Sequence, residues 1–221
     1  MTLTEVKRRL KSLILSSKHV RSKKQRFLEK RKSEYDYSKK TPTILCSNCI
    51  GGMIYSNLGL RFMSPTINLW CDAEDLAKVA QRPEHYLSQQ IEFVRDDPEY
   101  RYDYPVGKID DVYLYFTHYK TEEEAARKWY ERRGRFDSDN VYIITDNNGL
   151  SETGREKLIN SRHRRLVIFT GEAERDEYDF QLHHDMRKSY SIRNYFGFAP
   201  FEEEFNYAAW LSDKENYRAE R

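Results

Sequence analysis

Cys49 and His118 are the two side chains whose types suggest nucleophilic catalysis. Cys49 follows the apolar run Thr43–Cys46 and precedes Gly51 and Gly52, so it stands where a strand passes into a helix. Free backbone N–H groups and the positive end of a helix favour a thiolate there. We expect the glycine pair to let the backbone approach a ligand. A thiol nucleophile needs a basic partner, and His118 is the expected general base.

Other polar side chains also follow predicted strands, where ligands bind in open α/β sheets. We expect Asp146 to orient His118 or to bind a hydroxyl group. Lys120 and Arg132 are expected to contact a phosphate. The full set of expected substrate-binding residues is Ser47, Asn48, Asn68, Tyr119, Lys120 and Arg132.

Each of these interpretations has a structural alternative. Cys49 could be a small buried hydrophobic residue, and with Cys46 it forms a C-x-x-C spacing that suits a redox pair. His118 could be a polar strand end bonded to backbone, and Arg132 could belong to a solvated helix end. We expect no metal site, because zinc takes four ligands and only Cys71 remains as a further thiol.

Several common catalytic motifs are missing from the chain. It contains no phosphate-binding loop, no dinucleotide fingerprint, no serine nucleophile elbow and no H-E-x-x-H zinc motif. A D-x-D motif occurs at residues 137–139, but it precedes a predicted strand rather than following one. The sequence therefore indicates no particular cofactor.

Short apolar runs alternate with helical patterns along the chain. Strands are expected at Thr43–Cys46, 65–70, 112–118, Val141–Asp146 and 166–169. Helices are expected from Gly51 to Leu58, after Asp72, from Pro83 to Val94, from Thr121 to Gly134, and after Ser151. This alternation predicts an α/β fold, with a mostly parallel or mixed sheet and helices on both faces. The aromatic tail at 195–211 is expected to pack on that body.

Charge divides the chain into a basic arm, residues 1–40, and a single α/β domain, residues 41–221. The arm carries a net charge of +10 and the body a net charge of −8. We expect the arm to be helical and either to dock on the body or to lie on anionic lipid. Nucleic acid is the least favoured partner, because the acidic body would repel phosphates.

Composition limits where the protein works. Aromatic residues make up 14% of the chain, which argues against intrinsic disorder. No apolar run approaches the roughly 20 residues of a membrane-spanning helix, and no secretory signal is evident. Three cysteines are too few for a disulfide framework. We therefore expect a cytoplasmic protein, with the arm as a possible peripheral contact to the inner face of the membrane.

Two specific blocks are S-N-C-I-G-G at residues 47–52 and H-Y-K at residues 118–120. Weaker blocks include Ser64 to Leu69, Tyr104 to Gly107, Lys128-Trp129 and Trp210-Leu211. Together they resemble a bacterial family catalogued as a domain of unknown function, whose members are usually labelled exopolysaccharide biosynthesis proteins. The resemblance covers about residues 41–212 and leaves the arm outside.

This resemblance implies an α/β fold and a role in making surface polysaccharide, either exopolysaccharide or capsule. One hypothesis is an acyl- or glycosyltransferase that acts on a glycan or on its lipid-linked precursor, with Cys49 and His118 at its centre. The alternative is a non-catalytic glycan-binding or assembly protein of the same pathway, whose aromatic rings stack on sugars.

Overall fold

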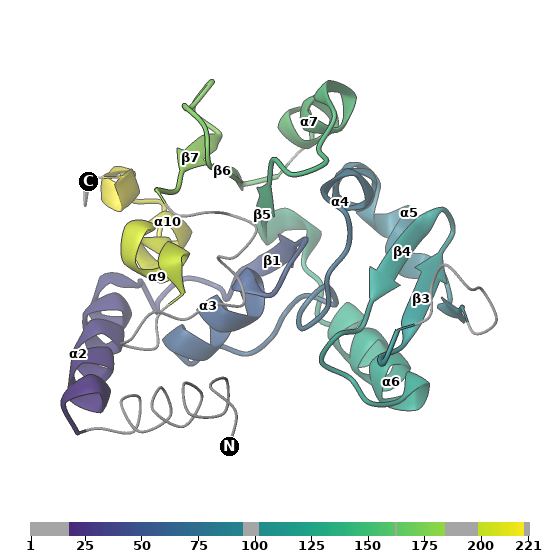
Figure 1. The fold of residues 1–221 in the computed structure, drawn as a ribbon, viewed down its shortest axis with the longest axis horizontal. Coiled ribbons are helices and arrows are strands. Elements are labelled where there is room, and N and C mark those ends of the chain that lie inside the picture. The colour runs from purple at the N-terminus through teal and green to yellow at the C-terminus, as the bar shows by residue number, and fades with distance from the viewer. Residues whose placement is uncertain (1–17, 95–101, 162, 184–198, 219–221) are drawn as a thin grey trace, which may run out of the picture. The chain divides into compact units, whose positions relative to one another are not determined.

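A computed structural model describes residues 18–94, 102–161, 163–183 and 199–218 (Figure 1). The chain divides into two compact units. The sheet unit comprises Lys40–Ser56 and Leu60–Gln181, and the terminal unit comprises Met1–Lys39, Asn57–Gly59 and Leu182–Arg221. All the residues expected at the catalytic site belong to the sheet unit.

A four-stranded parallel sheet forms the centre of the sheet unit (Figure 1). Its strand order is β1 (Thr43–Cys46), β5 (Val141–Asp146), β6 (Arg165–Thr170) and β7 (Asp179–Gln181). Every residue of β1 is buried, as expected for a strand covered on both faces. The predicted α/β class is confirmed.

Side chains cover the outer edge of β1, which has no strand beside it among the residues that the structure describes. The Ile44 N–H donates to the Tyr55 hydroxyl at 2.9 Å, and the Cys46 N–H donates to Thr66 Oγ1 at 3.0 Å. The Tyr55 hydroxyl in turn donates to the Pro42 carbonyl at 2.6 Å. These bonds satisfy backbone groups that an edge strand would otherwise leave unpaired.

A second, antiparallel sheet was not expected from the sequence. It joins β2 (Glu92–Phe93), β3 (Val106–Ile109) and β4 (Val112–Tyr115). The helix predicted to run to Val94 is therefore too long, because α5 (Pro83–Ser88) ends before β2. The predicted strand at 112–118 also ends early. Asp110 and Asp111 form the β3–β4 turn, with Asp110 at a φ of 53°, and this two-residue signal could have revealed the hairpin.

The remaining helices of the predicted set are present. They are α3 (Ile50–Leu58), α4 (Ala73–Gln81), α6 (Glu122–Arg133) and α7 (Glu152–Ile159). Thr121 and Ser151 cap α6 and α7 by accepting from the N–H groups of Glu124 and Gly154, as the sequence predicts. Asp72 precedes α4 but makes no side-chain cap bond.

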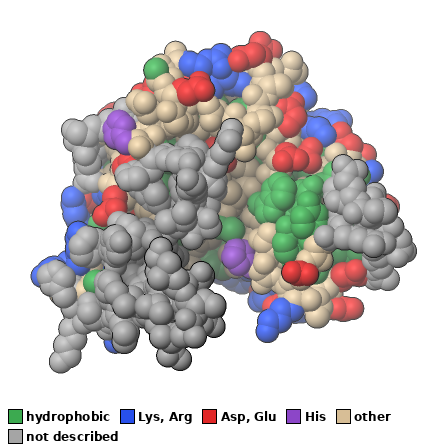
Figure 2. Space-filling model, in the orientation of Figure 1, with side chains coloured by type: hydrophobic (Ala, Val, Ile, Leu, Met, Phe, Trp, Pro, Cys, Tyr) green, Lys and Arg blue, Asp and Glu red, His purple; other side chains and the backbone are tan. Residues whose placement is uncertain are grey.

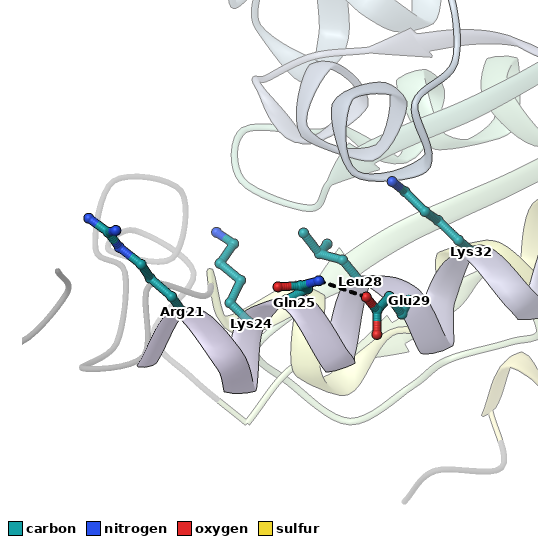
Figure 3. Close-up of a pocket in the computed structure, with 6 residues that line it drawn as sticks. All are labelled: Arg21, Lys24, Gln25, Leu28, Glu29 and Lys32. Carbon is teal, nitrogen blue, oxygen red and sulfur yellow. Dashed lines mark hydrogen bonds between the residues drawn. The ribbon is translucent and has the colours of Figure 1, made fainter. Parts of the chain in front are cut away.

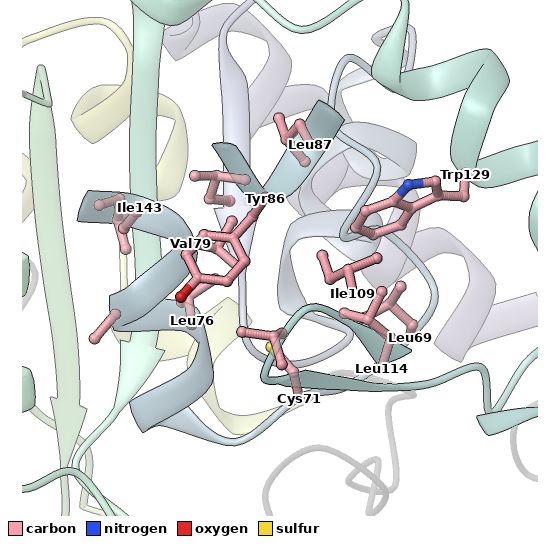
Figure 4. Packing of buried hydrophobic residues seen from close by; sticks show 14 of the residues in the cluster. Leu69, Cys71, Leu76, Val79, Tyr86, Leu87, Ile109, Leu114, Trp129 and Ile143 are labelled. Carbon is pink, nitrogen blue, oxygen red and sulfur yellow. The ribbon is translucent and has the colours of Figure 1, made fainter. Parts of the chain in front are cut away.

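One apolar core connects the two sheets of the sheet unit (Figure 4). It combines Leu45 and Ile143 from the parallel sheet, Ile109 and Leu114 from the antiparallel sheet, Leu76 from α4, and Trp129 from α6. All of these side chains are almost completely buried. Because the core is continuous, it fixes the positions of the turns after β1 and β4 relative to each other.

Residues 65–70 do not form the strand that the sequence predicts. They form turns, and only Trp70 pairs with another strand, through an isolated bridge to Tyr115. Asn68 adopts a left-handed backbone conformation, with a φ of 63°. That conformation is incompatible with a continuous strand, although the run of β-branched and aromatic residues is typical of one.

The terminal unit contains the basic helix α2 (Lys18–Glu34), with α9 (Pro200–Glu204), α10 (Tyr207–Leu211) and the 3₁₀ helix η3 (Glu215–Arg218). Helix α10 packs against α2. Arg31 is buried, and its guanidinium lies 4.9 Å from the Phe27 ring and 5.7 Å from the Tyr207 ring. The predicted helix in the basic arm is confirmed over Lys18–Glu34, and residues 1–17 lie outside the described residues.

The tail aromatics Phe201, Phe205 and Trp210 are buried within the terminal unit. The tail residues 195–198 lie outside the described part of the chain. Within that part, no helix is both long enough and apolar enough to cross a membrane.

Candidate functional site

Cys49 and His118 meet in the folded chain. The distance from Cys49 Sγ to His118 Nε2 is 3.1 Å. Cys49 lies between the end of β1 and the start of α3, and His118 lies in a tight turn after β4. In that turn the Tyr119 N–H donates to the Phe116 carbonyl at 2.9 Å. The thiol is partly buried, whereas the imidazole is exposed.

Asn48 shapes the turn that presents Cys49. Its Oδ1 accepts from the Ile50 N–H at 3.0 Å and from the Cys46 thiol at 3.1 Å. Its Nδ2 donates to Asp146 Oδ2 at 3.3 Å. Both the oxygen and the nitrogen of this buried amide are bonded inside the fold, so Asn48 positions Cys49. A contact between Asn48 and substrate stays a prediction.

Asp146 lies beside this turn because β5 is the neighbour of β1 and their carboxyl ends share one edge. Its Oδ1 accepts from the Asn148 N–H at 3.0 Å. The bonds that the structure describes for this carboxylate therefore go to Asn48 and Asn148, and not to His118. The expected role in orienting His118 finds no support in these contacts.

Ser47 is buried and tied to the same edge of the sheet. Its hydroxyl accepts from Thr145 Oγ1 at 3.0 Å, and its carbonyl accepts from the Cys71 N–H at 2.9 Å. Ser47 thus joins the ends of β1 and β5 beneath Cys49. A contact with substrate stays a prediction for this residue.

Gly51 and Gly52 have a packing role that the sequence analysis did not anticipate. A Cβ on Gly52 would lie 2.7 Å from Asn68 Oδ1, and a Cβ on Gly51 would lie 3.0 Å from Ile67 Cδ1. The glycines therefore let α3 approach the turn at 65–70, whereas the expectation was an approach to a ligand. Asn68 is half-buried at this contact, next to the first turn of α3.

Tyr119 and Arg132 are both buried, and both bond to the turn at residues 65–70. The Ile67 carbonyl accepts from the Tyr119 hydroxyl at 3.0 Å and from Arg132 Nη1 at 2.8 Å. The Arg132 guanidinium also lies 5.1 Å from the Phe62 ring. These contacts use Arg132 as an internal brace, so the expected phosphate contact is not supported by its position.

Lys120 is exposed and does not join this cluster. It precedes α6, and its backbone N–H is 3.4 Å from Glu124 Oε2. Its side chain lines a separate open cavity with Tyr102 and Glu122. Of the predicted site residues, the structure therefore brings Cys49 and His118 into contact. The contacts of Ser47, Asn48, Asn68 and Asp146 stabilise the turns next to this pair.

Burial raises the pKa of the Cys49 thiol above its usual value. This corrects the expectation of a lowered pKa. Burial is the one resolved cause of this shift, and the Ile50 N–H at the start of α3 donates to Asn48 Oδ1. The helix end therefore does little to stabilise a Cys49 thiolate. At neutral pH the resting pair is a thiol beside His118.

Cys46 is fully buried, and burial raises its pKa to about 12. All three cysteines are free thiols. Cys46 packs inside the sheet and bonds to Asn48, so the C-x-x-C spacing serves a structural purpose at its first position. Cys49 is the only one of the three that is not buried.

The described residues contain no group of three or more His, Cys, Asp or Glu side chains placed to hold a metal ion. The D-x-D motif lies before β5, at the opposite end of that strand from Asp146. Asp137 accepts from the Asp139 N–H and pairs with Lys40 at 2.8 Å. The motif therefore forms a local turn with its own ion pair.

A second groove runs along α2 in the terminal unit (Figure 3). It has a volume of about 380 Å³ and is lined by Arg21, Lys24, Gln25, Leu28, Glu29 and Lys32. Three of these six side chains are basic, and Gln25 donates to Glu29 at 2.9 Å within the groove. This basic face belongs to the arm, for which the sequence analysis leaves two alternatives open, docking on the body and contact with anionic lipid.

The fold and the site define an α/β protein with a cysteine–histidine pair beyond the carboxyl end of a parallel strand. The chain belongs to the family described as "Domain of unknown function (DUF1919)", whose model matches residues 18–212. The match includes α2, which the sequence analysis left outside the resemblance. An "Uncharacterized protein" from Haemophilus influenzae (strain ATCC 51907 / DSM 11121 / KW20 / Rd) is 33% identical over 150 residues, which cover 67% of this chain and 71% of that protein.

Proposed function

We propose that this protein is an acyltransferase of surface-polysaccharide biosynthesis, with Cys49 as nucleophile and His118 as general base. The observation that carries the proposal is the 3.1 Å contact between Cys49 Sγ and His118 Nε2. Such a contact between a nucleophile and a base, in a turn after a parallel strand, is the arrangement used for covalent acyl transfer. The polysaccharide pathway rests on the sequence resemblance alone.

The reaction has two steps. In the first, Sγ attacks the carbonyl carbon of an ester or thioester donor while His118 Nε2 takes the thiol proton. The tetrahedral intermediate then collapses, the bond to the leaving group breaks, and His118 returns the proton to that group. The product is a thioester on Cys49. A raised thiol pKa is compatible with this route, because the proton leaves during attack.

In the second step, an acceptor hydroxyl or amine attacks the thioester carbonyl while His118 takes its proton. The C–S bond breaks, and the departing sulfur recovers the proton from His118. The acyl group has then moved from donor to acceptor, and the pair is restored. Asn48 acts as a positioning residue, because its bonds to Ile50, Cys46 and Asp146 fix the backbone that carries Cys49.

The geometry favours acyl over glycosyl transfer. A thiol beside an imidazole is suited to attack on a carbonyl, whereas glycosyl transfer is more often assisted by carboxylates. Asp146, the one carboxylate in the predicted set of site residues, accepts from Asn48 Nδ2 and from the Asn148 N–H.

A further part of the proposal concerns the location of the enzyme. The basic arm, residues 1–40, would hold it on anionic lipid at the inner face of the membrane, near a lipid-linked acceptor.

The alternative function is glycan binding or assembly without catalysis. The observation that favours it is an aromatic pair, in which the Trp70 ring stacks on the Tyr115 ring with centroids 3.8 Å apart.

The test is acyl-enzyme formation by the full-length protein with p-nitrophenyl acetate. Wild-type protein should carry one acetyl group on the Cys49 peptide, detected by mass spectrometry after acid quench. Cys49→Ala should lose the label and at least about a thousandfold of the transfer rate, with an unchanged melting temperature. Cys71→Ala is the matched control and should keep the label. Full activity in Cys49→Ala would rule out covalent catalysis.

A further inference from the structure

Asn68 lies against the first turn of α3, close to the cysteine that the proposed function uses as nucleophile. A Cβ placed on Gly52 would lie 2.7 Å from Asn68 Oδ1, so the amide occupies the space that a larger residue would fill. The Cys49 carbonyl accepts from the Met53 N–H at 3.1 Å, which makes Cys49 part of the same helical turn. Residues three apart share a helix face, with Cβ atoms about 5–6 Å apart. The Asn68 amide therefore lies near Cys49 on one face of α3.

The side-chain amide of Asn68 has no bond inside the fold. Within the part of the chain that the structure describes, neither its oxygen nor its nitrogen has a hydrogen-bond partner. Oδ1 is the amide atom nearest to Gly52, so the donor Nδ2 lies farther from the helix. The Asn48 amide differs, because both of its ends are bonded. A half-buried amide without a partner keeps its two N–H donors for a ligand.

The backbone of Asn68 is fixed before any substrate binds. Its left-handed conformation, with a φ of 63°, is one that asparagine tolerates better than most residues other than glycine. The Ile67 carbonyl just before it accepts from the Tyr119 hydroxyl at 3.0 Å and from Arg132 Nη1 at 2.8 Å. Because Tyr119 directly follows His118, the Tyr119 bond also connects the turn of the general base to the turn of Asn68.

We infer that Asn68 Nδ2 donates a hydrogen bond to the oxyanion that forms when Cys49 attacks an acyl donor. This inference rests on the proposed function and adds a catalytic residue to it. Attack by Sγ makes the carbonyl carbon tetrahedral and leaves a negative charge on the former carbonyl oxygen, while His118 holds the thiol proton. A donor already fixed beside that oxygen stabilises the transition state more than the ground state.

The surroundings of the pair suit this role. His118 is exposed, so an acyl donor can reach it from solvent, and Figure 2 shows histidine side chains at the surface of one face of the molecule. Asn68 is half-buried, so a hydrogen bond from its amide is screened by water less than one from a fully exposed side chain. The site therefore combines an accessible base with a sheltered donor.

Two reactions of the same thiol test this inference in the full-length protein. Acetylation of Cys49 by p-nitrophenyl acetate passes through an oxyanion. Alkylation by iodoacetamide displaces iodide from a saturated carbon and forms no oxyanion, although His118 can take the thiol proton in both reactions. Each rate constant is measured on the Cys49 peptide by mass spectrometry. The ratio of acetylation to alkylation then reports the stabilisation of the oxyanion.

Variants at left-handed positions give the sharpest comparison. Asn68→Gly removes the amide and keeps the left-handed backbone free of strain. Its acetylation rate should fall about a hundredfold, while its alkylation rate and melting temperature stay close to those of wild type. Asn68→Asp keeps the shape of the side chain but cannot donate, so its ratio should fall at least as far. Asp110→Gly is the matched control, because Asp110 has a φ of 53°, and it should keep the wild-type ratio.

The inference is overturned if the ratio in Asn68→Gly stays within about tenfold of wild type, including the case in which both reactions slow equally. Acetylation of Cys49 in wild type with that unchanged ratio would refute the role of Asn68 and leave the proposed function standing. A wild-type protein that is alkylated but never acetylated at Cys49 would refute the proposed function, and the role of Asn68 with it.

Discussion

Two segments flank the first turn of α3 and are held in different ways. Thr43–Cys46 is stabilised by a regular parallel ladder to β5, and its other edge is closed by Tyr55 and Thr66. Residues 65–70 have almost no ladder. They are fixed by buried side chains, chiefly Arg132 and Tyr119 bonded to the Ile67 carbonyl. The turn that carries Cys49 is therefore positioned by backbone hydrogen bonds of the parallel sheet, whereas the turn at residues 65–70 is positioned by a few buried polar side chains.

Arg132→Ala should destabilise the turn at residues 65–70 and leave the strand Thr43–Cys46 intact. It removes a buried cation and leaves the Ile67 carbonyl short of a donor, so we expect a loss of roughly 2–4 kcal/mol in the free energy of unfolding. Urea unfolding measures this loss. Arg127→Ala, at an exposed site of the same helix, should change the free energy by less than about 0.5 kcal/mol. A stable Arg132→Ala protein would refute the internal brace.

Gly52→Ala should disturb the contact between the two segments. The added Cβ would lie 2.7 Å from Asn68 Oδ1 and 3.2 Å from Ile67 Cγ2, so we expect a loss of about 1–3 kcal/mol in stability. Gly134→Ala is the control, because its added Cβ has no neighbour closer than 3.7 Å. Equal unfolding midpoints for the two variants would show that α3 does not need this close approach.

The parallel part of the fold was predictable because it follows from local patterns. The buried run Thr43–Cys46, the Thr121 cap of α6 and the apolar strand before Asp146 all appear where the sequence places them. The run at 65–70 misled the prediction, because its side chains suit a strand while distant Arg132 fixes a turn. Such tertiary bonds have no local sequence signal.

The candidate site was predictable in its residues more than in their roles. The types and spacing of Cys49 and His118 pointed to a nucleophile and a base, and the fold brings them within 3.1 Å. The pKa of Cys49 was predicted in the wrong direction, because a sequence does not show that the thiol is largely buried or that Asn48 accepts from the Ile50 N–H. The sequence suggested an exposed Arg132, because it does not show that the Phe62 and Tyr119 rings pack around the guanidinium.

The most direct test of the cysteine–histidine pair is the pH dependence of Cys49 acetylation by p-nitrophenyl acetate in wild type, His118→Ala and His85→Ala. Near neutral pH the wild-type rate should exceed that of His118→Ala by roughly a hundredfold or more, because the imidazole takes the thiol proton. The difference in rate between wild type and His118→Ala should disappear at alkaline pH, above the usual cysteine pKa. Burial raises the pKa of Cys49, and the variant reacts only through the thiolate that forms at high pH. His85, which pairs with Asp110, is the exposed control and should behave like wild type. Superimposable profiles for wild type and His118→Ala would contradict the account.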